Sequence, residues 1–563
     1  MFMRTLCRSL VFTFVCSTVL FLQELPHSWI HAQDAPELIE LKEESSQDAQ
    51  DVYADGAAYQ NGGKYAIAIE EWVKFRDQFS DDPKAPKSIY YLGICSLQLK
   101  KYDDAAAAFE FTATRYAKHE NSEAAFFYWG RTRYAQAFGS QDAKVRSEHL
   151  QAAVSAFDQQ LKSFEKGAMA ADAHFLRGES FYNLGDKAKA IADYRAVVTG
   201  FPKAGDREQA VYVLGATLEE EEKFKEAGVA YDLFLKEFPG SGLRTEVRMR
   251  KAETILKDGK FEQAAQMFAE VAAVEGFSYA THARLRQASC LVSLDQLDDA
   301  ATIYQSVFEA TPDADHKKTA VVQLNLLCRK YIDKKLYDKS LALAEQMVSK
   351  ADTEDLKVRF KMAAADSFDG QAKYEEARPR YLAIVKDHTT HVLAADALYF
   401  AAFAAFQLKQ YDAVLEDSVE FKKQFAEHEF AKDVEKLVEE SRVLKSVDLF
   451  KDEKFAESVE LLAAVVAANP EGKRAAESLL LLARSQARLE KYDEAKASIG
   501  KLISGFPESS LIPESTYRLG EYHFVSNDYA GAITQFTAVI EKFADSSFAK
   551  DAMGRRADVK FEL

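Results

Sequence analysis

Aromatic and small apolar positions recur along this chain with a period of 37 residues. The positions with large side chains directly follow short polar stretches such as Gly63-Lys64, and we use them as anchors. The thirteen anchors are separated by 37, 48, 37, 37, 37, 36, 40, 37, 37, 44, 37 and 37 residues. They are Tyr65, Tyr102, Leu150, Lys187, Phe224, Phe261, Leu297, Tyr337, Tyr374, Tyr411, Phe455, Tyr492 and Tyr529. A fixed period of about 20 to 50 residues predicts a stacked array of repeats rather than one compact core.

Small residues hold two fixed places in each repeat. Three residues after the anchor, ten of the thirteen repeats have alanine. Nine residues before it stand Gly56, Gly93, Gly130, Gly178, Gly215, Ala252, Ala288, Cys328, Ala365, Ala402, Ser446, Ala483 and Gly520, with Gly130 counted before an insertion in its repeat. Small side chains at fixed points on two helices let the helix axes approach closely, whereas a leucine there would overpack by roughly 1–3 kcal/mol.

Large side chains come seven residues after the anchor, one helical turn beyond the alanine and on the same face. They are Trp72, Phe109, Phe157, Tyr194, Tyr231, Phe268, Tyr304, Tyr381 and Phe536. Phenylalanine recurs fourteen residues after the anchor, and proline follows it directly at Pro202, Pro239 and Pro507. Proline lacks the amide proton and restrains the preceding residue, so it ends a helix. Each repeat is therefore predicted to be a helix, a short turn and a second helix.

These offsets resemble the tetratricopeptide repeat over about residues 48–563, although the usual period of that repeat is about 34 residues. The resemblance implies an all-α, superhelical α-solenoid of about 13 helix-turn-helix repeats. It also implies a protein-binding scaffold without catalytic activity. The longer period and the ends Phe238-Pro239-Gly240-Ser241 and Phe506-Pro507-Glu508-Ser509 look like the bacterial cell-envelope branch. That branch includes the outer-membrane assembly lipoprotein and the Tol-Pal coordinating protein.

The N-terminal residues 1–32 have the pattern of a secretory signal peptide. Arg4 and Arg8 precede an apolar run from Leu10 to Leu22, which is too short to span a bilayer. Residues 33–51 are rich in Asp and Glu and predict a flexible acidic leader before a solenoid at 52–563. We therefore expect an exported protein of the periplasm or cell envelope of a Gram-negative-type bacterium, with no transmembrane span.

Three breaks in the period modify the array. The third repeat carries eleven extra residues around 137–148, which we expect in a surface loop between its two helices. Three extra residues precede Tyr337 and seven precede Phe455, and weak interfaces between neighbours are where such arrays bend. We therefore expect a hinge near residues 426–445. The half unit 548–563 predicts a lone terminal helix that caps the stack.

Catalytic and cofactor motifs are missing from the sequence. There is no Walker loop, GxGxxG, HExxH, GxSxG or Ca²⁺ loop, so we expect neither an enzyme nor a cofactor or metal. The one close histidine pair, His388 and His391, makes at most a surface metal site. Cys95, Cys290 and Cys328 occupy slots for small side chains. The net charge of −17, from 72 basic and 89 acidic residues, disfavours nucleic acid as a partner.

The candidate peptide-binding groove consists of aromatic residues on the first helices. The resemblance implies that these helices line a concave surface. The aromatic residues twelve or five positions before the anchors would form its strip: Tyr90, Phe127, Tyr134, Phe175, Tyr182, Tyr212, Tyr399 and Phe406. The alternative is that these rings pack against the next repeat. Late acids fifteen positions before the anchor (Asp396, Glu440, Glu477, Glu514) favour a basic partner.

Two functions from different classes fit these features. The first is an exported scaffold that binds proteins or peptides of the cell envelope through its groove, as a member of an envelope complex. The second is a structural spacer, or a self-associating envelope component, with contacts along exposed edges. A third hypothesis, an enzyme hidden in the irregular repeats, lacks any supporting motif.

Overall fold

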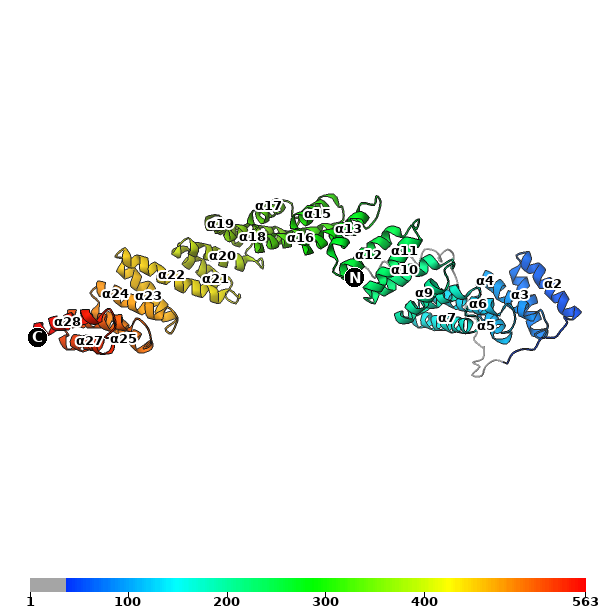
Figure 1. Cartoon of the computed structure of the whole chain (residues 1–563), viewed down its shortest axis with the longest axis horizontal. Helices are drawn as coiled ribbons and strands as arrows, with labels where there is room; N and C mark the ends of the chain where they lie inside the picture. Colours follow the sequence, from blue (N-terminus) through cyan, green and yellow to red (C-terminus); the bar gives the residue numbers. More distant parts are fainter. Residues whose placement is uncertain (1–36) are drawn as a thin grey trace. The chain divides into compact units, whose positions relative to one another are not determined.

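The computed structural model describes residues 37–563, and its described part contains helices and no strands (Figure 1). The predicted signal peptide 1–32 lies outside the described residues. The chain forms two compact units, and the boundary between them falls between Ala300 and Ala301, within helix α15. Helices of the first unit are α2(Gln47–Asn61), α3(Tyr65–Gln78), α4(Ala85–Gln98), α5(Tyr102–Arg115), α6(Ser122–Gly139), α7(Ala143–Ser163), α8(Ala170–Leu184), α9(Lys187–Gly200), α10(Arg207–Glu220), α11(Phe224–Glu237), α12(Arg244–Lys257), α13(Phe261–Ala272) and α14(Ala280–Ser293). After α15(Leu297–Ala310), the second unit has α16(Ala314–Asp333), α17(Tyr337–Val348), α18(Glu354–Gly370), α19(Tyr374–Asp387), α20(Ala394–Gln407), α21(Tyr411–Gln424), α22(Ala431–Lys451), α23(Phe455–Ala468), α24(Ala475–Arg488), α25(Tyr492–Gly505), α26(Ile512–Val525), α27(Tyr529–Lys542) and α28(Ala549–Glu562).

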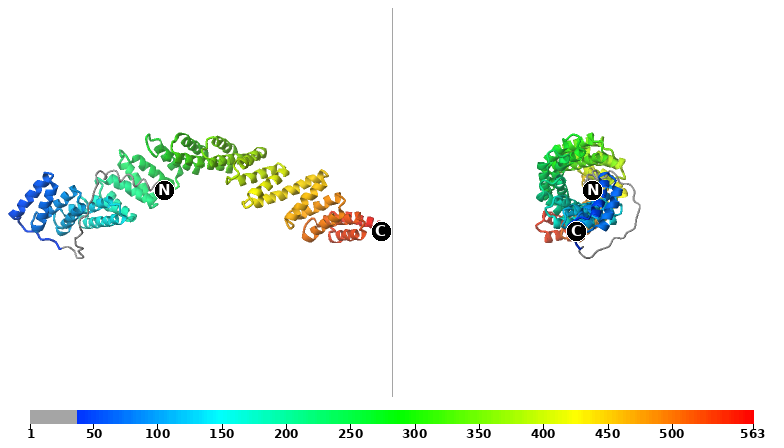
Figure 2. Two further views of the ribbon diagram at one scale, coloured as in Figure 1. Left: turned by 180° about the vertical axis from the view of Figure 1, so that it is seen from behind. Right: turned by 90° about the vertical axis from the view of Figure 1, so that its right-hand side faces the viewer.

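Helices that follow one another in the chain pack together in pairs within each unit, and Figure 2 shows the same succession from behind. The even-numbered helices are the first helices of the repeats, and the odd-numbered helices are the second. Twelve of the thirteen predicted anchors are the first residue of a second helix, from Tyr65 in α3 to Tyr529 in α27. Leu150 is the exception and lies inside α7. The predicted all-α repeat architecture is confirmed.

The turn between the two helices has the same backbone geometry in almost every repeat. The residue two positions before the anchor has a positive φ, for example Lys100 at 58° and Ala372 at 57°. The next residue donates its amide proton back into the first helix, as Lys101 N does to Ser96 O at 2.8 Å. This left-handed residue with its back-donated hydrogen bond is the Schellman ending of a helix. Glycine relieves the backbone strain only at Gly63, Gly185 and Gly259 of these turns.

The small residue nine positions before the anchor lies against the large ring seven positions after it. A Cβ added at Gly93 would stand 2.6 Å from the Phe109 ring, and one at Gly215 would stand 2.5 Å from the Tyr231 ring. Both rings are fully buried. The two periodic features of the sequence therefore form one contact, in which the first helix presents its bare backbone to an aromatic face of the second.

The boundary between the predicted leader and the solenoid lies earlier than expected. The sequence predicts a flexible leader at 33–51, but α2 begins at Gln47 with Ser46 as its N-cap. Residues before it are held as well, because Ile39 N donates to Arg115 O at 3.0 Å and Lys42 N to Asp81 O at 2.7 Å. An acidic composition did not reveal these backbone hydrogen bonds, whose acceptors are the last residue of α5 and a residue in the turn after α3.

Extra residues lengthen helices instead of forming loops. The eleven extra residues of the third repeat, expected in a surface loop, extend α6 and α7 and leave only residues 140–142 as a turn. Asp142 caps α7 by accepting from Lys144 N at 2.7 Å. The segment 426–445 is mostly helix α22, which continues to Lys451. The extra residues there lengthen a helix, and a hinge at this place stays a prediction.

Candidate functional site

The eight aromatic residues of the predicted groove lie on the first helices, as expected, but they differ in exposure. Phe127 and Tyr212 are buried, with 7% and 4% of their surface exposed, and the other six are half-buried. Each of the eight rings makes contacts within the array. For some of them, the ring packs against the next repeat, which is the alternative to a role in a peptide-binding groove.

Four tyrosine rings near the N-terminal end of the described chain lie on three successive first helices. We call Tyr53, Tyr90, Tyr91 and Tyr128, from α2, α4 and α6, the N-terminal aromatic strip. Tyr90 contacts Tyr91 at 5.9 Å and Tyr128 at 6.0 Å between ring centroids, and all four rings are half-buried. Burial and the neighbouring phenols raise the pKa of Tyr90 to about 12. Tyr91 and Tyr128 lie one position beyond the predicted aromatic offset, so the periodicity argument missed them.

Basic side chains lie over the strip. The Nζ of Lys84 is 5.1 Å from the Tyr53 ring centroid, and the guanidinium of Arg131 is 5.9 Å from that of Tyr128. Such cation–π contacts are worth about 0.5–1 kcal/mol at exposed sites. Because the rings remain partly exposed beneath long basic side chains, the strip offers both apolar and charged contacts to a partner.

The middle rings connect neighbouring repeats through acids. Tyr182 of α8 donates to Glu220 of α10 at 2.9 Å, and Tyr212 of α10 donates to Glu246 of α12 at 2.6 Å. These hydrogen bonds tie one first helix to the next. Phe175 packs on Tyr194 of its own repeat, with ring centroids 6.1 Å apart. This part of the predicted set contributes to cohesion of the stack.

The last two predicted residues lie in the second unit. Tyr399 stacks on Phe430, with centroids 4.5 Å apart and planes at 18°. Phe406 contacts Tyr411 edge-on at 6.2 Å. Both rings are half-buried and belong to α20. Tyr399 therefore packs against the start of the following repeat, whereas Phe406 packs within its own repeat.

The late acids that favoured a basic partner mostly have internal partners. Arg474 pairs with both Glu440, at 3.2 Å, and Glu477. Glu514 pairs with Arg518 at 3.4 Å, and Asp396 faces His428 at 3.4 Å. Since these carboxylates already have basic partners within the chain, they give little support to a basic partner at this end.

Buried acids beneath the second-helix tyrosines were not predicted from the sequence. Where the large ring is tyrosine instead of phenylalanine, its hydroxyl requires a partner in the interior. Tyr194 donates to Glu179 at 2.7 Å, Tyr231 donates to Glu219 at 2.7 Å and Tyr381 donates to Asp366 at 2.8 Å. The sequence did carry a signal for these buried acids: seven positions after the anchor, tyrosine stands in some repeats where others have phenylalanine.

Burial dominates the electrostatics of these acids. It raises the pKa of Glu179 and of Glu219, and the tyrosine hydrogen bonds oppose the shift only in part. It also raises the pKa of Asp366 to about 7, with the negative charges of Asp369 and Asp396 acting in the same direction. Buried carboxylates of this kind carry a desolvation cost that other groups must compensate.

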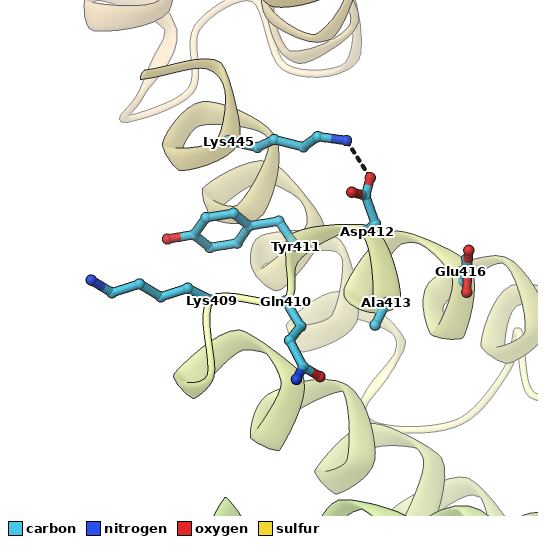
Figure 3. Close-up of a pocket in the computed structure, with 7 residues that line it drawn as sticks. All are labelled: Lys409, Gln410, Tyr411, Asp412, Ala413, Glu416 and Lys445. Atoms are coloured by element: carbon cyan, nitrogen blue, oxygen red, sulfur yellow. Dashed lines mark hydrogen bonds and ion pairs between the residues drawn. The ribbon is translucent and has the colours of Figure 1, made fainter. Parts of the chain in front are cut away.

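An open depression of ≈ 480 Å³ lies at the turn between α20 and α21, beside α22 (Figure 3). It is lined by Lys409, Gln410, Tyr411, Asp412, Ala413, Glu416 and Lys445. Lys445 forms an ion pair with Asp412, drawn as a dashed line in Figure 3. Because these facing charges neutralise each other, the pair fastens α21 to α22 and leaves no convergent set of groups for a ligand.

Residues 37–563 contain no group of three or more His, Cys, Asp or Glu side chains placed to hold a metal ion. His388 contacts Lys361 Nζ at 3.0 Å and His391 contacts Asp355 at 3.2 Å, so the close histidine pair faces separate partners. Among the helices of this same range, none combines the length and apolarity needed to cross a bilayer.

The stack of two-helix repeats, with aromatic and acidic residues on its first helices, defines the class of protein: an α-solenoid. The sequence profile of the tetratricopeptide repeat matches residues 53–118, 142–205, 250–315, 362–413, 444–497 and 480–547, which together are more than half of the chain. The chain therefore belongs to the tetratricopeptide repeat family.

Solved structures with similar arrangements share little sequence with the chain. The Naa15/Naa10 complex bound to HypK-THB is 14% identical, with a TM-score of 0.38, and the match covers 91% of this chain and 78% of that one. The C-terminal part of a TPR repeat-containing protein from Cytophaga hutchinsonii is 16% identical, with a TM-score of 0.34 and coverages of 47% and 97%. A thermophilic TPR protein of Thermus thermophilus is 18% identical, with a TM-score of 0.24 and coverages of 37% and 99%. No curated protein sequence matches the chain.

Proposed function

We propose that this protein is a non-enzymatic scaffold that binds partner polypeptides along the first helices of its repeats. The observation that carries the proposal is the N-terminal aromatic strip. Its four half-buried tyrosines come from three successive repeats, so an extended segment lying across the stack would contact all of them. Aromatic rings supply large contact areas at small cost in conformational entropy, and they dominate binding energy at protein interfaces.

The proposed place of action is the envelope of a Gram-negative-type bacterium. The support is the N-terminal sequence, in which Arg4 and Arg8 precede the apolar run Leu10 to Leu22 as in a secretory signal. The similarity of the repeat ends, such as Phe506-Pro507, to the cell-envelope branch of the family supports the same place. Membership of an envelope complex follows as part of the proposal.

Crosslinking followed by affinity capture from the envelope fraction of the native host tests both statements. The control is a variant without residues 1–32. Recovery of envelope proteins by the wild type, and not by the control, is the expected result. A bait that is crosslinked only to itself would overturn the scaffold function in favour of a self-associating spacer.

A paired substitution tests the strip itself. Tyr91→Ser with Tyr128→Ser removes two half-buried rings, and we expect partner capture to fall at least tenfold while the helical circular dichroism persists. The control pair is Tyr59→Ser with Tyr102→Ser, which also removes two half-buried rings, outside the strip. Equal losses of capture in both pairs would contradict a role specific to the strip.

A further inference from the structure

Mostly buried carboxylates on the first helices α10 and α12 are each paired with an arginine from the following first helix. Arg286 of α14 holds Glu253 of α12 through two hydrogen bonds, one of them from Nε to Oε1 at 2.6 Å. Arg250 of α12 lies 3.4 Å from Glu219 of α10. Removing a carboxylate from water is costly unless a cation and further hydrogen bonds compensate it. The arginines supply that compensation.

Glu179 of α8 is the exception in this series. Only 6% of its surface is exposed, and its Oε1 accepts a hydrogen bond from the Tyr194 hydroxyl at 2.7 Å. Among the described residues, none donates a side-chain hydrogen bond or forms an ion pair with Oε2. The arginine closest in sequence, Arg177, is engaged by Asp193 and Asp158 instead. Glu179 is therefore a buried acid for which the described chain supplies no cation.

The repeat register shows where that cation is missing. Arg250 and Arg286 both stand eleven residues before the anchors of their repeats, Phe261 and Leu297. In the repeat that follows Glu179, the position eleven before Phe224 is Val213. Glu179 and Glu253 occupy equal places, eight residues before their anchors. The chain thus repeats the acid but replaces the arginine by an apolar residue.

Besides Tyr194, two further tyrosines lie near the uncompensated acid. Tyr134 of α6 is half-buried, and burial together with the nearby Glu179 charge raises its pKa. Tyr182 lies one helical turn after Glu179 on α8 and is half-buried as well. A guanidinium group is planar, remains charged and stacks on aromatic rings while it donates to a carboxylate. Carboxylate and phenol rings together suit such a group better than a compact ammonium.

We propose that Glu179, with Tyr134 and Tyr182, binds an arginine side chain of a partner polypeptide. The incoming guanidinium takes the place that Arg286 fills for Glu253. This inference rests on the proposed scaffold function and adds the chemistry of one side chain that the partner must carry. It assigns a binding role to Tyr134 of the predicted groove, and a second role to Tyr182, whose hydroxyl also donates to Glu220 of α10.

The test uses an array of short peptides with mixed flanking residues and a fixed central arginine or citrulline, its neutral analogue. The full-length protein is compared with Glu179→Gln, Val213→Arg and the matched control Glu165→Gln. Glu165 is exposed on the loop before α8, so this control removes the same charge from nearby without touching the site.

We expect the wild type and Glu165→Gln to prefer arginine over citrulline by about 10- to 100-fold, as for close interfacial charge pairs. Glu179→Gln removes the negative charge that accepts the guanidinium. Val213→Arg supplies an internal arginine that pairs with Glu179. Both variants should therefore lose the preference for arginine over citrulline. If Val213→Arg fails to fold, Glu179→Gln decides the result alone.

The possible results distinguish a failure of the arginine site from a failure of the scaffold function. Retention of the arginine preference by Glu179→Gln, or peptide binding by the wild type without any arginine preference, overturns the arginine site and leaves the scaffold function standing. A wild type that binds no peptide of either series counts against the scaffold function itself.

Discussion

Phe109 packs its ring directly on the backbone of Gly93, so closely that a Cβ at Gly93 would lie 2.6 Å from the ring. The same contact joins Gly130 to Phe157 and Gly520 to Phe536. It explains why glycine and aromatic residues recur in phase with each other.

Gly93→Ala is expected to destabilise the first unit by roughly 1–3 kcal/mol, because the buried Phe109 ring cannot move without displacing its neighbours. Denaturant unfolding followed by circular dichroism measures the change. Gly228→Ala is the control, since its Cβ would meet only Thr254 Oγ1 at an ordinary 3.5 Å. This control should be neutral or stabilising by up to about 1 kcal/mol, as for glycine in a helix interior. Equal effects of the two changes would contradict the close contact.

Ala372→Gly is expected to stabilise the second unit by up to about 1 kcal/mol. Ala372 has a φ of 57°, in the left-handed region, where the Cβ of an L-residue costs roughly 1–2 kcal/mol. Glycine avoids this steric cost but loses more backbone entropy on folding, so the net gain in stability is smaller than the steric cost. The matched control is Ala383→Gly at an exposed position inside α19, which should destabilise by about 0.5–1 kcal/mol. Thermal unfolding of both variants gives the comparison, and a loss of stability in Ala372→Gly would be evidence against strain at the turn.

Asp366 makes stability depend on pH. Its folded-state pKa of about 7 lies above the ordinary 3.8 because the carboxyl is buried, next to Asp369 and Asp396. The hydrogen bond from Tyr381 and the charge of Arg329 oppose this shift without cancelling it. The unfolded chain releases the proton first as pH rises, so folding loses stability between about pH 4 and pH 7.

Comparison with Asp366→Asn isolates this effect from the other carboxyl groups. The two proteins should be about equally stable near pH 4, and the variant should be more stable at pH 8 by roughly 1–4 kcal/mol, at about 1.4 kcal/mol per pKa unit. Chemical unfolding at both pH values measures the difference. A difference that does not change with pH would show that Asp366 ionises normally in the folded chain.

The three cysteines of the described chain should be chemically inert in the folded protein. Burial raises the pKa of Cys95 and of Cys290 to about 11 and that of Cys328 to about 12. Only the thiolate is nucleophilic, so alkylation at about pH 8 should be negligible until the chain is unfolded. Mass spectrometry of protein lacking residues 1–32, treated with iodoacetamide with and without denaturant, tests this. Rapid labelling of any one of the three in the native state would contradict its burial.

Periodicity was sufficient to locate nearly every repeat. The anchors Tyr102 and Phe224 begin second helices as expected, because a helix pair repeated in sequence must repeat its buried face. The loop expected around 137–148 is instead helical, since a sequence such as Ala143 to Glu148 can extend a helix once Asp142 caps it. Sequence spacing counts extra residues but does not say whether they lengthen a helix or a loop.

The candidate site could be predicted only in outline. Offsets placed Tyr90 and Tyr399 on first helices, yet they could not distinguish them from Phe127 and Tyr212, which are buried. Exposure depends on how far the neighbouring first helix approaches, which is set by side chains in the adjacent repeats. The strip tyrosines Tyr91 and Tyr128 lie one position beyond that offset, so the offsets did not include them.

The amino-acid sequence alone determined that this protein is a stack of two-helix repeats, because small and large apolar side chains recur at fixed helical offsets and can be buried only by like neighbours. Tertiary structure decided which charges are compensated. Glu253 meets Arg286 across a repeat boundary, whereas Glu179 finds, among residues 37–563, only the hydroxyl of Tyr194 as a side-chain partner. The free energy of a buried charge depends on groups that folding brings within a few ångströms, and these groups lie on other helices, here α14 for Glu253 and α9 for Glu179.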